Sequence, residues 1–323
     1  MRAVVCESFS EPEELQLRQL DTPPCGPGQV RVHVWASGVN FVDALFVQGR
    51  YQIRPPLPFV PGSEIAGEVT EVGAEVDGFS VGDRVMASVG LGGYADEIVL
   101  SPGQLVPIPD RLSFGQAATM TQSYATAWFA LTRRTRVAAD EWVVVLGAAG
   151  GVGLATMDVA RSLGAKVLAA ASTDEKLQLC IERGAHNVVN YTTEDLKTRV
   201  RELTDGGADV VVDPVGGDTS EPALRALGNG GRFLVIGFAS GTIPELPANQ
   251  ILLRNRTVLG VDWGAWAMAD PAANGEVVAE VLDKVAEGVL SPAEPETYTL
   301  GDAGTALRDL LERRITGKVC LTP

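Results

Sequence analysis

The chain has 323 residues, of which 46% are hydrophobic and 21% charged, and its formal net charge at pH 7 is −15. This length favours two domains, and no apolar run reaches the roughly 18 to 20 residues that span a bilayer. The negative charge should repel phosphate backbones and anionic lipid surfaces, so neither nucleic acid nor a membrane is expected as a partner.

Two features bear on the cellular compartment. The first residues, Met1 to Glu7, lack the apolar core of a signal peptide, so a cytoplasmic location is expected. The four cysteines are widely spaced without a C-x-x-C pair: Cys6, Cys25, Cys180 and Cys320. Neither a disulfide framework nor a structural zinc site is indicated, and we expect reduced thiols that mostly serve as packing residues.

The region up to about residue 120 is predicted to be all-β, because short alternating segments are separated by many glycines and prolines. Val30, Val32 and Val34 alternate with other side chains, as in a strand with one buried face. After this strand, Asn40 can cap a short helix that ends near Gly49.

A helix from Gln116 to Leu131 is predicted to lead into a second region. There the apolar run Trp142 to Leu146 enters a glycine-rich turn, and apolar residues at helical spacing follow it as far as Gly164. The pattern predicts a buried strand, a tight turn and a helix.

This turn has the chemistry of a phosphate-binding loop. Glycines let the backbone approach a pyrophosphate, whose charge would face the free N–H groups and the dipole of the helix. The fingerprint is incomplete, because Ala148 replaces its first glycine and leaves A-x-G-x-x-G through Gly150 and Gly153. Alone, it is equally compatible with an ordinary strand-to-helix turn.

The elements after the turn favour the dinucleotide interpretation. Further short apolar strands alternate with helices, and the predicted strands are 166–170, 188–189, 209–213, 232–236 and 257–261. Six such strands separated by helices predict a parallel, doubly wound sheet. Two amphipathic helices and a last strand near Lys318 to Leu321 are expected to fold back onto the N-terminal region.

In their order and spacing, several motifs resemble the medium-chain dehydrogenase/reductase superfamily, in its zinc-free NADPH:quinone oxidoreductase (zeta-crystallin-like) branch, over essentially the whole chain. The motifs are A-S-G-V-N at 36–40, the glycine pattern of 62–73, V-G-D-R-V at 81–85, G-G-Y-A at 92–95, the turn at 148–153 and G-K-V at 317–319. The resemblance implies an α/β protein with a GroES-like β-barrel catalytic domain at 1–122 and 262–323. A doubly wound Rossmann domain is expected at 123–261.

The main departure from the superfamily concerns metal. Its zinc alcohol dehydrogenases carry a cysteine where this chain has Asn40 and a histidine where it has Ser63, and they add a lobe with four closely spaced cysteines. An amide and a hydroxyl are poor zinc ligands, and the two histidines, His33 and His186, lie elsewhere. We therefore predict no catalytic zinc.

The cofactor is predicted to be NADPH. An NAD-selective site usually has an acidic residue at the end of the second strand, whereas Ser172 stands there and leaves room for a phosphate. Lys176 and Tyr191 match positions that similar quinone oxidoreductases use for the 2′-phosphate, and Arg313 is a weaker match. Asp174 is the competing detail, because it could bind a ribose if the turn were shifted by two residues.

The resemblance implies an active site in the cleft between the domains, with the nicotinamide near Asn40, Thr126 and the strand end at Gly237 and Phe238. The residues expected to bind the cofactor are Asn40, Thr126, Ala149, Gly150, Gly151, Val152, Gly153, Ser172, Lys176, Tyr191, Gly237, Phe238 and Arg313.

The expected catalytic residues are Asn40 and Tyr51. Without zinc, a quinone or an α,β-unsaturated carbonyl is the best acceptor, because it delocalises the incoming charge. Tyr51 could donate a hydrogen bond or a proton to the acceptor oxygen, and Asn40 could place the nicotinamide or the acceptor. A rim tyrosine and a helix cap are the structural alternatives. For Glu64 and Asp213 we favour structural roles.

The leading hypothesis is an NADPH-dependent reductase of a small-molecule quinone or enone that transfers a hydride or single electrons. A 2-enoyl thioester reductase and a non-catalytic, crystallin-like NADPH-binding protein are the alternatives. The resemblance also implies a homodimer, with the segment Val258 to Val261 as a plausible edge strand.

Overall fold

The computed structural model describes residues 1–323, which form two compact units. The first unit comprises Met1–Gln122 and Pro292–Pro323, and the second unit comprises Ser123–Ser291. The second unit is therefore inserted into the first, as the sequence suggests.

The return to the first unit comes later in the chain than residue 262, where it was expected. Residues 262–291 form helices α8 (Trp263–Ala269) and α9 (Pro271–Ala286), which belong to the second unit. Trp266 stacks on Phe129 with ring centroids 4.5 Å apart. The Trp128 indole donates a 2.6 Å hydrogen bond to Glu280. Through Trp266 and Glu280, α8 and α9 both contact the segment that opens this unit.

That opening segment is α2 (Phe114–Trp128), which continues as a π-helical stretch, η3 (Phe129–Arg134). The pair covers the helix expected at 116–131. Because α2 is almost fully buried along its second half, packing rather than helix propensity determines how far it extends.

The second unit is built on six parallel strands with the order β10-β9-β8-β11-β12-β13. The strands are β8 (Trp142–Leu146), β9 (Lys166–Ala171), β10 (Asn187–Asn190), β11 (Ala208–Asp213), β12 (Leu227–Val235) and β13 (Thr257–Gly260). In chain order this is the arrangement 3-2-1-4-5-6 of a doubly wound fold, whose ligand crevice lies where the order reverses, between β8 and β11. The predicted Rossmann fold is confirmed.

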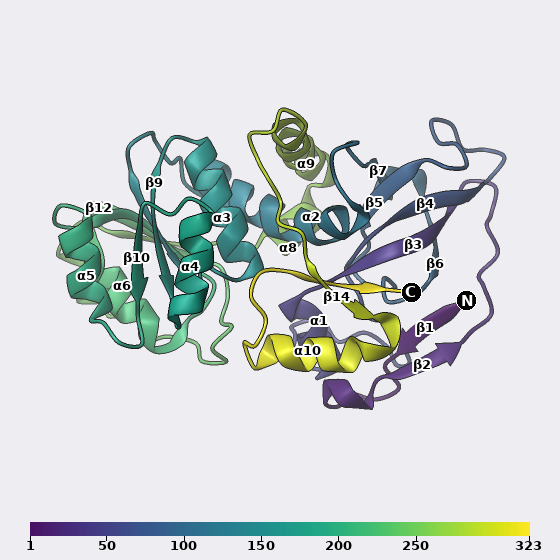
Figure 1. Ribbon diagram of the computed structural model, residues 1–323, viewed down its shortest axis with the longest axis horizontal. Coiled ribbons are helices and arrows are strands. Elements are labelled where there is room, and N and C mark those ends of the chain that lie inside the picture. The colour runs from purple at the N-terminus through teal and green to yellow at the C-terminus, as the bar shows by residue number, and fades with distance from the viewer. The chain divides into compact units, whose positions relative to one another are not determined.

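Helices cover both faces of this sheet, with α3 and α4 beside one face and α5 and α6 packed together on the other (Figure 1). Their bounds, with the short helix that comes after them, are α3 (Gly151–Ser162), α4 (Asp174–Glu182), α5 (Leu196–Leu203), α6 (Ser220–Ala226) and α7 (Ala248–Leu252). Burial on two sides explains why the central strands are continuous apolar runs. Val143, Val144 and Val145 of β8 are fully buried.

The first unit is a mainly antiparallel sheet with the order β14-β15-β3-β4-β5-β7, in which β6 also pairs with β3. The strands are β3 (Val30–Val39), β4 (Glu64–Val72), β5 (Arg84–Ser88), β6 (Glu97–Leu100), β7 (Val106–Pro107), β14 (Glu296–Thr299) and β15 (Val319–Thr322), with a separate hairpin of β1 (Arg2–Val5) and β2 (Gln16–Gln19). Val30, Val32 and Val34 are fully buried, which confirms the predicted one-sided strand.

The long strand β3 organises this unit. Its first half pairs with β6 and its second half with β15, while β4 runs along its other side. Two helices, α1 (Phe41–Val47) and α10 (Ala303–Leu311), pack against each other on this sheet. The remaining elements are single turns of 3-10 helix: η1 (Pro12–Glu14), η2 (Pro102–Gln104), η4 (Gly217–Thr219) in the second unit and η5 (Leu300–Asp302).

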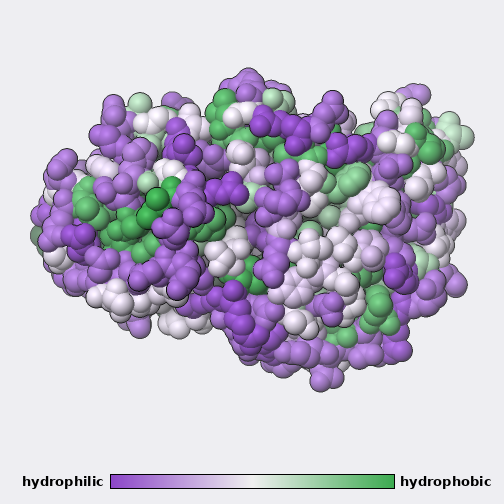
Figure 2. Space-filling model, in the orientation of Figure 1, coloured by the Kyte–Doolittle hydropathy of each residue, from purple (hydrophilic) through white to green (hydrophobic).

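The surface agrees with the composition. Figure 2 shows hydrophilic side chains over most of the visible face of each unit, with apolar residues confined to separate patches. None of the helices combines the length and the apolar character that crossing a membrane requires.

Candidate functional site

The glycine-rich turn lies at the carboxyl end of β8, next to the reversal of strand order. Gly147 has a φ of +57°, and the N–H of Gly150 closes the turn on its carbonyl at 2.9 Å. Helix α3 starts at once, and its first internal hydrogen bond runs from Leu154 N–H to the Gly150 carbonyl. The three N–H groups before it, those of Gly151, Val152 and Gly153, have no acceptor within the helix, which is the condition for binding an anion there.

Close packing inside the turn explains why position 153 is a glycine. A Cβ added to Gly153 would lie 2.4 Å from the carbonyl oxygen of Gly147 and 2.6 Å from that of Ala148. Both atoms belong to the backbone of the turn, so neither can move without opening it. The glycine therefore holds the start of α3 against the end of β8, as the dinucleotide fingerprint requires.

The ends of β9 and β10 bring Ser172, Lys176 and Tyr191 to one corner of the sheet. The N–H of Tyr191 donates to the carbonyl of Ala171 at 3.1 Å, and Thr192 Oγ1 donates to the carbonyl of Ser172 at 3.0 Å. Helix α4 begins two residues after Ser172, which places Lys176 in its first turn. This corner is adjacent to the glycine turn because β9 pairs with β8.

The competing acid, Asp174, has a hydrogen-bond partner at the same corner. Its Oδ1 accepts a 2.8 Å hydrogen bond from Asn190 Nδ2, at the end of β10. As the first residue of α4, it also has the position that suits an acidic side chain at a helix start. The carboxylate thus has a local structural role.

The strand ends beyond the reversal are tied together by Asp213. Its carbonyl accepts the N–H groups of Ile236 and Gly237, and its carboxylate accepts N–H bonds from Val215 and Gly216, both at 2.8 Å. Burial raises the pKa of Asp213, and the shift is opposed by a 2.6 Å hydrogen bond from the Ser220 hydroxyl and by the two backbone N–H bonds to the carboxylate. Asp213 is thus a turn residue that fixes the end of β12.

The remaining residues expected in this unit lie at several places. Gly237 and Phe238 come directly after β12, and Phe238 is 36% exposed. Thr126 is half-buried on α2. Arg313 belongs to the first unit, where it is exposed just beyond α10 with a φ of +58°.

In the first unit, strand pairing assembles a polar cluster around Asn40. Asn40 follows the last residue of β3, and Val39 pairs with Val319 of the antiparallel strand β15. The residue before Val319, Lys318, therefore lies opposite Asn40. On the other side of β3, Gly38 pairs with Glu64 at the start of β4. Three segments distant in sequence thus meet at one end of β3.

The Asn40 amide is fully engaged by this cluster. Its Oδ1 accepts a 2.6 Å hydrogen bond from Lys318 Nζ, and its Nδ2 donates to Glu64 Oε1 at 2.8 Å. A longer bond of 3.3 Å runs from Nδ2 to Ser63 Oγ. Glu64 is 1% exposed, accepts the N–H of Gln122 at 2.8 Å on its second oxygen, and lies 3.5 Å from Lys318 Nζ.

Asn40 occupies the N-cap position of α1, where it forms a capping box with Asp43. In this box, Asp43 Oδ2 accepts the Asn40 backbone N–H at 2.8 Å. Asp43 Oδ2 also accepts the Tyr94 hydroxyl at 3.1 Å. Asn40 therefore has the helix-cap position of the structural alternative, and its amide also contacts Lys318 and Glu64.

Asp43 is completely buried, and its hydrogen-bond partners carry no positive charge. Burial raises the pKa of Asp43 from 3.8 to about 7, against the hydrogen bonds from Asn40 and Tyr94. The same burial, with the nearby Asp43 carboxyl, raises the pKa of Tyr94 well above its ordinary value. The cluster thus contains two acidic side chains. Glu64 has a cationic partner, Lys318, and Asp43 has none.

Tyr51 lies in the irregular segment between α1 and β4. Its ring meets Phe46 edge-on, with centroids 4.9 Å apart, and the residue is half-buried. This contact suits the rim tyrosine and leaves its proposed catalytic role a prediction.

Sequence reasoning missed most of the cluster around Asn40. Lys318 was noticed only as part of a motif, and Asp43, Tyr94 and Gln122 were given no role. The signal that could have found Lys318 is its place beside a short apolar strand, but the partner of that strand is not visible in a local pattern.

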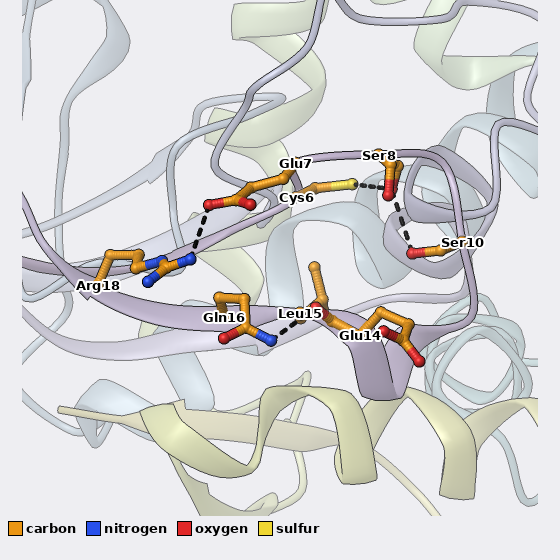
Figure 3. Close-up of a pocket in the computed structure, with 8 residues that line it drawn as sticks. All are labelled: Cys6, Glu7, Ser8, Ser10, Glu14, Leu15, Gln16 and Arg18. Carbon is orange, nitrogen blue, oxygen red and sulfur yellow. Dashed lines mark hydrogen bonds and ion pairs between the residues drawn. The ribbon is translucent and has the colours of Figure 1, made fainter.

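A cavity of about 320 Å³ lies elsewhere in the first unit (Figure 3). It is lined by Cys6, Glu7, Ser8, Ser10, Glu14, Leu15, Gln16 and Arg18. Arg18 is paired with Glu7 at 3.0 Å, and burial raises the pKa of the Cys6 thiol, so the cavity contains no activated nucleophile. Its chemistry does not indicate a catalytic site.

Comparison with known proteins places this geometry in a family. The family model "Alcohol dehydrogenase GroES-like domain" matches residues 26–110, and "Zinc-binding dehydrogenase" matches residues 151–283. The quinone oxidoreductase-like protein 2 homolog of Nematostella vectensis is 42% identical over 324 residues, which cover 99% of this chain and 88% of that protein. The chain belongs to the quinone oxidoreductase family. The medium-chain dehydrogenase/reductase resemblance is thereby confirmed.

Solved structures agree with this family. The quinone oxidoreductase of Escherichia coli complexed with NADPH is similar over 100% of both chains, with a TM-score of 0.90 and 30% identity. A structure described as an NAD-dependent alcohol dehydrogenase also covers 100% of both chains, with a TM-score of 0.91 and 33% identity.

The residues at Asn40 and Ser63 do not fit the zinc of the alcohol dehydrogenases in this superfamily. An amide and a hydroxyl replace the soft or imidazole ligands, and no group of three His, Cys, Asp or Glu residues is arranged to hold a metal. The ammonium of Lys318, 2.6 Å from Asn40 Oδ1, would also repel a divalent cation there. Zinc-independent chemistry remains a prediction that these side chains favour.

Substituting Gly153 by alanine is expected to destabilise the second unit by about 1–3 kcal/mol, because the new methyl group would press on two backbone carbonyls. Gly275→Ala in helix α9 is the matched control, since a Cβ there meets nothing within 4 Å. It should be neutral or stabilising by up to about 1 kcal/mol. Urea unfolding of both variants measures the difference, and equal stabilities would contradict the packing account.

The raised pKa of Asp43 predicts a pH-dependent stability. The carboxyl ionises near pH 3.8 in the unfolded chain but keeps its proton up to about pH 7 in the fold, so the free energy of unfolding falls as the pH rises through this window. Relative to Asp43→Asn, which mimics the protonated carboxyl, the loss is on the order of 4 kcal/mol. Urea denaturation of both proteins across this window tests it, and a constant difference between them would count against the buried carboxyl.

Proposed function

We propose that the chain is an NADPH-dependent oxidoreductase that reduces a small conjugated carbonyl compound, a quinone or an α,β-unsaturated ketone, without a metal. The observation that carries the proposal is that a glycine turn and a polar corner lie at the ends of adjacent strands of the second unit. The glycine turn after β8 suits a pyrophosphate, and the corner formed by Ser172, Lys176 and Tyr191 suits an additional phosphate.

The phosphate-bearing nucleotide is favoured over NAD by the side chains at the end of β9. Ser172 stands where an acid would bind a ribose hydroxyl, and the nearby Asp174 is held by Asn190. The solved structure of the Escherichia coli relative in complex with NADPH supports the same choice.

In this proposal, residues of the chain bind the phosphate groups of the cofactor, orient the reacting partners and donate a hydrogen bond to the acceptor. The N–H groups of Gly151, Val152 and Gly153 would hold the pyrophosphate, and Lys176 with Tyr191 would hold the 2′-phosphate. When bound, NADPH supplies a hydride or single electrons. Asn40 would orient the nicotinamide or the acceptor, and Tyr51 would offer a hydrogen bond or a proton to the acceptor oxygen.

A conjugated acceptor is favoured by the donors available. The side chains around Asn40 fit no Lewis acid, so a simple aldehyde would lack a strong electrophilic partner. A quinone or enone spreads the arriving charge over several atoms and ends as an oxyanion that a hydrogen bond can stabilise. Homodimer formation and a cytoplasmic location stay predictions.

The decisive measurement is stopped-flow loss of NADPH absorbance with a panel of quinones, enones and 2-enoyl-CoA thioesters, after treatment of the enzyme with a chelator. We expect turnover of a quinone or an enone at a rate that the chelator does not change. Turnover of enoyl-CoA alone would identify a thioester reductase. Tight NADPH binding with no turnover would identify a binding protein.

Lys176→Ala should raise the Michaelis constant for NADPH about 10- to 150-fold while changing that for NADH little, because a charge-assisted hydrogen bond to the 2′-phosphate is worth about 1.5–3 kcal/mol. Lys197→Ala on the exposed face of α5 is the control and should change neither constant. Steady-state kinetics with the two cofactors measures the effect. An equal rise for both cofactors would reject the assignment of Lys176.

A further inference from the structure

The partners of Asn40 determine which way its amide faces. A lysine ammonium can only donate hydrogen bonds, and an ionised carboxylate can only accept them. Asn40 Oδ1 lies 2.6 Å from Lys318 Nζ, and Nδ2 lies 2.8 Å from Glu64 Oε1. Turning the amide over would set its NH₂ group against the ammonium and its oxygen against the carboxylate, so both contacts would become repulsive.

Burial strengthens this constraint. The side chains of Lys318 and Glu64 are 12% and 1% exposed, and Asn40 is 8% exposed. In such surroundings a charge-assisted hydrogen bond is stronger than at the surface, and its partners polarise one another. A positive charge at the oxygen and a negative charge at the nitrogen draw the amide electrons in the same direction, toward the oxygen.

One of the two Nδ2 hydrogens is less firmly held than the other. The bond to Glu64 is short, whereas the bond to Ser63 Oγ is 3.3 Å long and uncharged. Ser63 Oγ also accepts a 3.3 Å bond from Gln122 Nε2, so two donors share this oxygen. The N–H that rests on Ser63 is therefore the one that a better acceptor could take over.

We propose that Lys318 and Glu64 are positioning residues that lock the Asn40 amide in one orientation and polarise it, so that the N–H resting on Ser63 is donated to a carbonyl oxygen of the reacting partners. The inference rests on the proposed function, in which the carbonyl belongs either to the carboxamide of the nicotinamide or to the electron acceptor. Lys318 acts through Asn40 and itself touches neither.

The test combines Lys318→Met, which keeps the stem but removes the charge, with Lys318→Arg, which keeps charge and donors. Lys284→Met is the control, because Lys284 forms a comparable 2.7 Å ion pair with Glu287 at the surface of α9. We expect Lys318→Met to lose about 10- to 100-fold either in kcat or in its affinity for NADPH. The arginine variant should recover most of this loss, and the control should match the wild type.

The parameter that changes identifies the carbonyl. A fall in kcat with an unchanged NADPH dissociation constant assigns the bond to the acceptor, and a weaker NADPH complex assigns it to the nicotinamide. Both results support the lock. Wild-type values for Lys318→Met, or losses in Lys318→Arg as large as those in Lys318→Met, would overturn it, since packing of the stem would then suffice or charge would not matter.

A double-mutant cycle tests whether Lys318 acts through Asn40. If it does, Lys318→Met added to Asn40→Ala should cost no more than Asn40→Ala alone. If the losses of Lys318→Met and Asn40→Ala multiply in the double variant, Lys318 acts independently of Asn40, and the proposal is rejected. Should Lys318→Met fail to fold in thermal unfolding, Lys318→Leu, which also removes both the charge and the donors to Asn40 Oδ1, replaces it with the same expectations.

A second readout does not depend on catalysis. In the ¹⁵N-labelled protein, the side-chain NH₂ signals of Asn40, assigned by their loss in Asn40→Ala, should move or broaden in Lys318→Met and stay in place in Lys284→Met. If the Asn40 signals do not move in Lys318→Met, Lys318 does not fix the amide, and the proposal is wrong. If the wild type turns over nothing in the acceptor panel, the proposed function fails, while these signals still decide whether Lys318 fixes the amide.

Discussion

The pairing of β15 with β3 is the contact on which the first unit depends. It inserts the last strand of the chain beside the longest strand of the N-terminal sheet, with Val319 opposite Val39. Both residues are buried in the same apolar cluster, so a slip of one position would take them out of it. The same register sets Lys318 against Asn40, and the polar cluster is therefore a by-product of apolar packing.

The second unit depends on a different constraint, which is that a parallel sheet buried on both faces must place all its loops at its two ends. Strand order then decides which loops meet. Because β8 lies between β9 and β11, the glycine turn adjoins both the corner with Ser172, Lys176 and Tyr191 and the turn built by Asp213. The chemistry expected of each loop depends on its place in this order, and a single glycine motif carries less information than its setting.

This difference explains how much could be predicted from the sequence. Strands buried on two sides leave continuous apolar runs, and helices between them leave a 3.6-residue period, so all six strands of the second unit were predicted. Strand β12 begins at Leu227, earlier than its apolar run, because Leu227 pairs with Ala208 across an irregular register. The glycine turn was recognisable because close backbone packing requires glycine at position 153.

Contacts between distant segments were not predictable in the same way. The end of the second unit was expected near residue 262, but Trp266 and Glu280 bind residues of the segment that opens this unit. The local sequence around these residues contains no pattern that predicts such contacts. Asn40 does stand at the start of a helix, as its local sequence indicates. What the local sequence does not indicate is that Lys318, 278 residues later, offers the Asn40 amide a charged partner.

Two carboxyl groups near Asn40 show how the cluster controls its net charge. Glu64 has the ammonium of Lys318 as a partner at 3.5 Å, whereas Asp43 has only neutral donors and keeps its proton up to about pH 7. Below that pH the buried charges cancel, because one ammonium faces one carboxylate. A cluster with no net charge but with a strongly oriented amide would gain little from an anionic or cationic ligand. In the proposed function, such a cluster would meet a neutral molecule whose oxygen becomes negative only during the reaction, as the oxygen of a conjugated carbonyl does.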